Sequence, residues 1–258
     1  MKVIYLAALG HSGSTWVQSE LVKRYKLIGL GEVFQLLRAI KSDDYSKIPV
    51  CSCGEKVKDC EFWGGFLDEL KGKEYDEAMN AILEYVKTHY PEYGIIDTSK
   101  SVQVIKKLYG DMIYAPNFFL VMLARDLRGW IMSVQNRDKR KGRTKKSFLN
   151  QTMRWFFLNK RIEDFIKKHS NMKSGFIFYE NLVFKNGLET NTVFNNYSEN
   201  DTNKVIMHDV FGNRMKASSE TDSIKYSTNW FYEFKFYLLF PLIYPALKKA
   251  KKYSESQF

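Results

Sequence analysis

The sequence predicts an α/β fold in which a mostly parallel sheet is covered by helices on both faces. Short apolar, β-like runs alternate with amphipathic helical patterns along the chain. The first apolar run leads through a turn of small residues directly into a helix. No internal repeat and no long linker interrupts the 258 residues, so we expect a single domain with a substantial core.

Strands are predicted where apolar residues cluster in short runs. These are residues 3–9, 26–30, 94–97, 118–124 and 175–178. In open parallel sheets, ligands bind beyond the carboxyl ends of the strands. Polar residues follow every predicted strand, and beyond the turn after the first strand they include Glu32, Asp97, Lys100, Arg125 and Tyr179. We expect them to converge on one edge of the sheet.

Helices are predicted between the strands from apolar residues spaced three and four apart. They span residues 15–24, 33–40, 75–89, 101–108, 127–137 and 148–168. The last of these carries Trp155, Leu158, Ile162 and Phe165 on one face, which we assign to the core. Residues 186–203, rich in Asn, Thr, Glu and Ser, read as a surface excursion, and residues 230–258 as an aromatic, helical C-terminal segment.

The formal net charge of +11 predicts an anionic partner, without choosing among nucleotide, acidic glycan, nucleic acid and lipid surface. No signal peptide is visible, and no apolar stretch approaches the roughly 20 residues of a membrane span. A cytoplasmic protein is therefore expected. The aromatic run 236–244 is interrupted by Pro241; we expect it to pack against the domain, with peripheral contact to an anionic membrane as the alternative.

The turn after the first strand has the composition of an anion-binding loop. It reads Gly10-His11-Ser12-Gly13-Ser14-Thr15-Trp16. Glycines allow close backbone approach, and the N–H groups at a helix N-terminus point toward phosphate oxygens. The turn lacks the Lys and the wide glycine spacing of a Walker A loop. It therefore favours a phosphate-bearing donor other than the ATP of P-loop ATPases.

The end of the fourth strand supplies a second candidate site. Arg125 and Ser133 bracket a strand-to-helix turn, so the two side chains can face one ligand. An Arg at the end of a buried strand needs a carboxylate partner unless it binds a ligand, and the neighbouring Asp126 cannot easily be that partner.

Three cysteines lie close together as Cys51, Cys53 and Cys60. A structural zinc site normally needs four ligands, and His89 or a carboxylate could supply the fourth. A single disulfide would leave an odd thiol. We expect a local structural loop, with metal binding as the alternative.

Together these motifs resemble the sulfotransferases that use 3′-phosphoadenosine 5′-phosphosulfate, in particular bacterial members. LGHSGSTW resembles the family's 5′-phosphosulfate loop, and Arg125 with Ser133 resembles its 3′-phosphate pair. The resemblance extends to further elements, which occur along this chain in the order that they have in the family. These are CSCG with the later CEFW, IIDTSK, FYENL and the segment 208–216. The resemblance implies a P-loop-like three-layer α/β/α fold and transfer of a sulfuryl group to a hydroxyl or amine, on a carbohydrate or small molecule.

The resemblance also implies roles for individual residues. Donor binding falls to Gly10, His11, Ser12, Gly13, Ser14, Thr15, Trp16, Arg125, Ser133, Asn213, Arg214 and Lys216. Glu32 is the first choice for the general base, with Asp97 as the alternative; Lys100 and His11 would contact the transferred group or leaving group. No metal is implied for the reaction. His208 is expected to be a structural histidine.

This sequence departs from the family where His11 replaces the usual Lys or Arg, and where Arg214 and Lys216 replace Pro and Arg. With the ordinary histidine pKa of about 6.5, protonation of His11 would raise activity as the pH falls toward that value. The basic run 137–146 reads as a solvated loop, with contact to an anionic acceptor as the alternative. A P-loop-type kinase and a non-catalytic binder of anionic polymers are the rival functions; nucleic acid is not expected as a partner.

Overall fold

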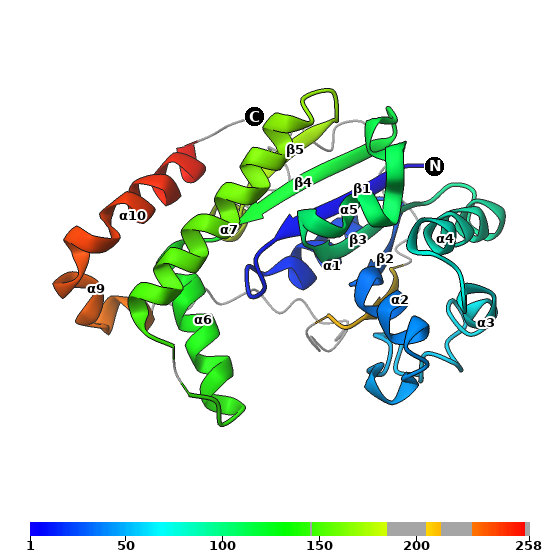
Figure 1. The fold of residues 1–258 in the computed structure, drawn as a ribbon, viewed down its shortest axis with the longest axis horizontal. Coiled ribbons are helices and arrows are strands. Elements are labelled where there is room, and N and C mark those ends of the chain that lie inside the picture. The colour runs from blue at the N-terminus through cyan, green and yellow to red at the C-terminus, as the bar shows by residue number, and fades with distance from the viewer. Residues whose placement is uncertain (145, 185–204, 213–228, 256–258) are drawn as a thin grey trace.

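A six-stranded parallel sheet forms the centre of the computed structural model, which describes residues 1–144, 146–184, 205–212 and 229–255 (Figure 1). The strands are arranged in the order β5-β4-β1-β3-β2-β6, and every neighbouring pair is parallel. Their bounds are β1 Val3–Ala8, β2 Leu27–Gly31, β3 Gly94–Lys100, β4 Phe118–Ala124, β5 Ser174–Phe178 and β6 Ile206–Val210.

The five predicted strands are confirmed within a few residues, and β4 matches its predicted bounds. β3 extends three residues beyond the prediction because polar Thr98, Ser99 and Lys100 continue the strand past a register shift against β1. β6 was not predicted. It is short, carries the polar His208 and Asp209, and pairs only with β2 among the described strands, so its sequence has a weak strand signal.

The helices also follow the predicted pattern. α4 and α7 match it, and α6 continues to Arg140, three residues beyond the prediction. The bounds are α1 Ser14–Arg24, α2 Val33–Lys41, α3 Leu67–Leu70, α4 Tyr75–His89, α5 Val102–Tyr109, α6 Leu127–Arg140, α7 Phe148–Lys168, α8 Tyr179–Phe184, α9 Lys235–Leu238 and α10 Phe240–Glu255.

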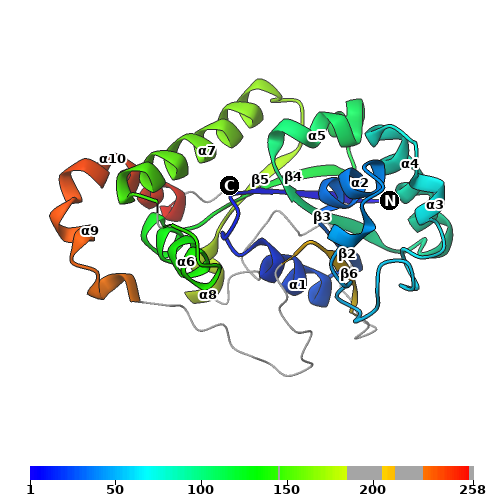
Figure 2. The ribbon, with the colours of Figure 1, turned by 60° about the horizontal axis from the view of Figure 1, so that its bottom comes forward.

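Side chains of β1 alternate between two apolar layers, as the two-residue period of a strand requires. Ile4 and Leu6 pack with α1 on one face of the sheet, whereas Tyr5 packs on the other face with residues of α5 and α7. Figure 2 shows α1 on the opposite side of the sheet from α5 and α7. This three-layer α/β/α arrangement leaves the carboxyl ends of the strands as the natural ligand edge.

The C-terminal helix α10 packs against α7. Ile243, Ala246 and Ala250 are buried, and Lys249 pairs with Glu163 of α7 at 2.7 Å. Leu242 on the other side of α10 is 62% exposed. Among the described residues, no helix is long and apolar enough to cross a membrane. Peripheral membrane contact stays a prediction, and the predicted surface excursion 186–203 lies outside the described residues.

Candidate active site

The turn between β1 and α1 has the backbone of an anion cradle. His11 and Gly13 have positive φ angles of 75° and 91°, with Ser12 between them, which is a backbone conformation found in anion-binding turns. Gly13 is also required by space, because a Cβ there would lie 2.4 Å from the ring of Tyr179. Gly13 is also the N-cap of α1, and it has no side chain that could accept a hydrogen bond from the first N–H groups of the helix.

A cleft of about 1350 Å³ opens over this turn. Most of the predicted residues line it, namely Gly10, His11, Gly13, Ser14, Thr15, Trp16, Glu32 and Lys100. Ser12 is buried beneath the turn, where its N–H donates to the carbonyl of Leu9 at 3.1 Å, and it does not line the cleft. Residues from β1, α1 and the ends of β2 and β3 are thus brought to one volume, as the parallel-sheet rule predicts.

Glu32 and Lys100 form an ion pair at the floor of the cleft. Lys100 Nζ donates to Oε1 of Glu32, and the two side chains are only 18% and 17% exposed. Lys100 has a positive φ of 68° at the end of β3, and the N–H of Glu32 donates to the carbonyl of Val210 in β6 at 3.0 Å. The chain positions a carboxylate and an ammonium together in the cleft.

Asp97 lies in the sheet core rather than in the cleft. It is fully buried, and its Oδ1 accepts hydrogen bonds from the N–H and hydroxyl of Ser99 at 2.7 and 2.6 Å, while the Tyr109 hydroxyl donates to Oδ2 at 3.0 Å. Burial raises the pKa of Asp97 to about 6, against these hydrogen bonds. Of the two carboxylates predicted as candidate bases, Glu32 lines the cleft and Asp97 does not.

His11 is uncharged at neutral pH. Its Nε2 accepts a hydrogen bond from the guanidinium of Arg137 at 2.7 Å. Burial, then the charges of Arg137 and Lys100, lower the pKa of His11 to about 4. The expectation that His11 gains a proton as the pH falls toward 6.5 is therefore wrong. Arg137, from the last turns of α6, supplies the permanent cation that the turn itself lacks.

Arg125 and Ser133 line a second cavity of about 720 Å³. Arg125 Nη1 donates to the carbonyl of His11 at 3.1 Å, and its guanidinium lies 4.7 Å from the ring centroid of Tyr179. No carboxylate within the described residues pairs with Arg125, and its buried Nε has no hydrogen-bond partner. Asp126 instead accepts two hydrogen bonds from the guanidinium of Arg128, both at 3.0 Å. Arg125 is thus free of a carboxylate partner and lies between the turn and the second cavity.

Several cleft residues were not predicted as site residues. Arg137, Arg140 and Lys141 belong to the basic run that we expected to be a solvated loop, but α6 continues through its first four residues and these three line the cleft. Arg154 and Arg161 line it from α7. Arg154 and Arg161 are seven residues apart with Leu158 between them, so the three residues lie on one face of the helix. This spacing is the sequence pattern from which the cleft-facing side of α7 could have been predicted.

The remaining predicted donor-binding residues, Asn213, Arg214 and Lys216, lie outside the described residues. Phe211 and Gly212, which directly precede them, line the cleft. The three cysteines do not line it.

The structural comparisons identify the fold. A sulfotransferase domain from the curacin biosynthetic pathway superposes with a TM-score of 0.53 at 16% sequence identity, covering 73% of this chain and 71% of that domain. A sulfotransferase from Alicyclobacillus acidocaldarius gives 0.39 at 10% identity over 70% of this chain and 74% of the other. An uncharacterized protein from Eubacterium ventriosum gives 0.32 at 15% identity over 69% and 89%. No protein-family model and no curated protein match the sequence.

The curacin-pathway domain is thus a distant structural neighbour, and its likeness concerns the fold. The chain has the P-loop-like α/β fold that this sulfotransferase domain also has. Fold alone does not determine chemistry, so the function must be argued from the cleft itself.

Proposed function

We propose that this protein is a sulfotransferase that moves a sulfuryl group from 3′-phosphoadenosine 5′-phosphosulfate to a hydroxyl or amine. The observation that carries the proposal is the pair of anion sites joined by Arg125. One is the backbone cradle at the N-terminus of α1, and the other is the cavity lined by Arg125 and Ser133. A donor with a phosphosulfate at one end and a separate 3′-phosphate at the other matches two such sites.

Each group in the cleft has a role in this reaction. The acceptor oxygen attacks the sulfur as the bond from sulfur to the bridging phosphate oxygen breaks, and adenosine 3′,5′-bisphosphate leaves. Glu32 takes the acceptor proton; Lys100 donates to its Oε1, which leaves Oε2 as the oxygen to accept that proton. The cradle N–H groups and Arg137 stabilise the charge that develops on the leaving oxygen.

The basic lining of the cleft indicates the kind of acceptor. Arg140, Lys141, Arg154 and Arg161 add positive charge to the side of the cleft formed by α6 and α7. This charge favours an acceptor that carries a carboxylate, phosphate or sulfate beside its hydroxyl.

Calorimetric titration tests the donor. We expect adenosine 3′,5′-bisphosphate to bind more tightly than AMP or ATP, and Arg125→Ala to weaken it roughly 10- to 100-fold, the value of hydrogen bonds to a charged group. Ser133→Ala should weaken it less. Arg38→Ala, which removes an exposed arginine of α2 away from both cavities, is the matched control and should change nothing.

The same titration distinguishes the rivals. A preference for ATP that requires magnesium would overturn the proposal in favour of a kinase. Equal, steeply salt-dependent binding of all anions, unchanged in Arg125→Ala, would indicate a non-catalytic binder of anionic polymers.

A further inference from the structure

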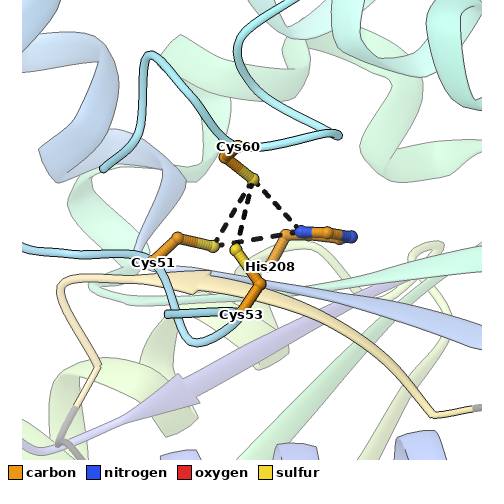
Figure 3. A group of neighbouring side chains, drawn as sticks. All are labelled: Cys51, Cys53, Cys60 and His208. Carbon is orange, nitrogen blue, oxygen red and sulfur yellow. Dashed lines mark hydrogen bonds between the residues drawn. The ribbon is translucent and has the colours of Figure 1, made fainter. Parts of the chain in front are cut away.

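The three cysteines meet one histidine at the far edge of the sheet. Cys51, Cys53 and Cys60 come from the loop after α2, and His208 comes from β6 (Figure 3). Their sulfur atoms and the Nδ1 of His208 all lie within 4.8 Å of one another. Cys51, Cys60 and His208 are buried, and all three thiols are free.

Four of the six distances among the ligand atoms are close to those of a tetrahedral site around one ion. Cys60 Sγ lies 3.7 Å from both Cys51 Sγ and Cys53 Sγ. Sulfurs at the usual zinc distance of about 2.3 Å in tetrahedral geometry are separated by about 3.8 Å. His208 Nδ1 lies 3.2 Å from Cys60 Sγ and 3.9 Å from Cys51 Sγ, around the roughly 3.5 Å expected between a nitrogen and a sulfur ligand.

We propose that Cys51, Cys53, Cys60 and Nδ1 of His208 form a structural zinc site. Thiolates with one imidazole are a donor set that suits Zn²⁺, and four protein ligands leave no open position for a substrate or water. His89, which the sequence offered beside a carboxylate as a possible fourth ligand, is not in the cluster: its ring stacks on Tyr85, 4.2 Å between centroids, and its Nδ1 lies 2.9 Å from the carbonyl of Tyr85.

The surroundings of the cluster orient its ligands. The ring of His208 stacks on Phe62 at 5.0 Å, and Trp63 Nε1 donates to the carbonyl of His208 at 2.8 Å. Such second contacts hold metal ligands in position in known sites.

The position of the cluster shows what the ion would stabilise. Ser52, between two of the cysteines, donates through its N–H to the carbonyl of Asp209 at 3.0 Å and through its hydroxyl to that of Met207 at 2.9 Å. The loop therefore lies along β6, which pairs only with β2 within the described sheet. Val210 of β6 in turn accepts from the N–H of Glu32. The ion would therefore hold the cysteine loop against β6, the edge strand that contacts Glu32 of the cleft through Val210.

Metal content of the full-length protein tests the site directly. Purified under reducing conditions, the wild type should hold one zinc per chain by mass spectrometry of the metal. X-ray absorption should show three sulfur ligands and one nitrogen ligand. Cys60→Ser and His208→Ala should lose zinc, whereas His208→Cys should retain it. His89→Ala, a histidine outside the cluster, is the control and should keep full occupancy.

The outcomes are independent of the proposed reaction, because none of them requires activity. Wild-type protein that contains no zinc and does not bind added zinc with its thiols reduced would overturn the proposal. A disulfide between two of the cysteines in protein purified with reductant would overturn it as well. If Cys60→Ser is insoluble, replacement of zinc by Co²⁺ in the wild type still decides, because thiolate-bound tetrahedral cobalt has characteristic visible absorption.

Discussion

Around the cleft, residues from β1, α1, α6 and α7 and the ends of β2 and β3 surround a volume of about 1350 Å³, whereas the four ligand atoms of the Cys–His cluster lie within 4.8 Å of one another. Arg137, Arg140 and Arg154 are among the cations that line the cleft, and Arg125, which has no carboxylate partner within the described residues, lines the neighbouring cavity. The cluster leaves space for a single ion among mostly buried ligands.

The difference separates reversible from permanent binding. A large, partly exposed cleft can release its ligand, as turnover requires. A closed four-ligand site keeps its ion, and the free energy of metal binding stabilises the folded state. β6 joins the two regions, since His208 lies in the cluster and Val210 contacts Glu32. The comparison predicts that variants in one region change catalysis or nucleotide binding, and variants in the other change stability.

The largest effect is expected at Glu32. Glu32→Gln removes the proposed base and should lower turnover roughly 10²- to 10⁴-fold while nucleotide affinity stays nearly constant. Steady-state rates and calorimetry on the same preparation check this. Glu20→Gln on α1, which loses only a surface pair with Lys23, is the control. If Glu32→Gln abolishes nucleotide binding instead, Glu32 holds the start of α2 and is not the base.

Next in size is loss of a ligand at the Cys–His cluster. Cys53→Ser, at the exposed cysteine, should cost about 2 kcal/mol, or roughly 5 °C in Tm, because the bound metal no longer favours the folded state. Affinity for adenosine 3′,5′-bisphosphate should remain. Arg125→Ala should do the reverse. A joint loss of both properties in either variant would contradict the separation of the two regions.

A smaller effect is expected at Gly13. In Gly13→Ala, a residue with φ of 91° gains a Cβ that meets the Tyr179 ring, so the turn must shift and nucleotide binding should weaken about tenfold. Gly72 has a similar φ of 81° but no atom close to the position of a Cβ, so Gly72→Ala introduces backbone strain without a clash. Equal behaviour of the two variants, measured by calorimetry and thermal unfolding, would show that only strain matters.

The smallest expected effect concerns His11. Its pKa of about 4 lies well below neutrality, so its charge should not change between pH 6 and 8. Arg137→Ala removes a positive charge and should raise the pKa of His11 only part of the way toward its ordinary value, because burial is the larger cause. NMR titration of the imidazole measures this, with Arg143→Ala as control. A wild-type pKa near 6.5 would contradict a partly buried His11 that is neutral at this pH.

The sequence by itself determined the layers and the edge that binds ligands. Apolar runs and helical spacing are local properties, so the five predicted strands and the helices α4 and α7 followed from them. The turn after β1 and the pair Arg125 and Ser133 could also be recognised from the sequence. Each lies at the end of a single strand, so its residues are close together in the chain.

Only the tertiary structure decided which distant residues meet and how buried they are. His208 lies 148 positions from Cys60, and Arg154 and Arg161 enter the cleft because of how α7 crosses the sheet. Burial removes Asp97 from the cleft and keeps His11 neutral beside Arg137. Desolvation and long-range contacts depend on the packed chain as a whole, so no local pattern in the sequence records them.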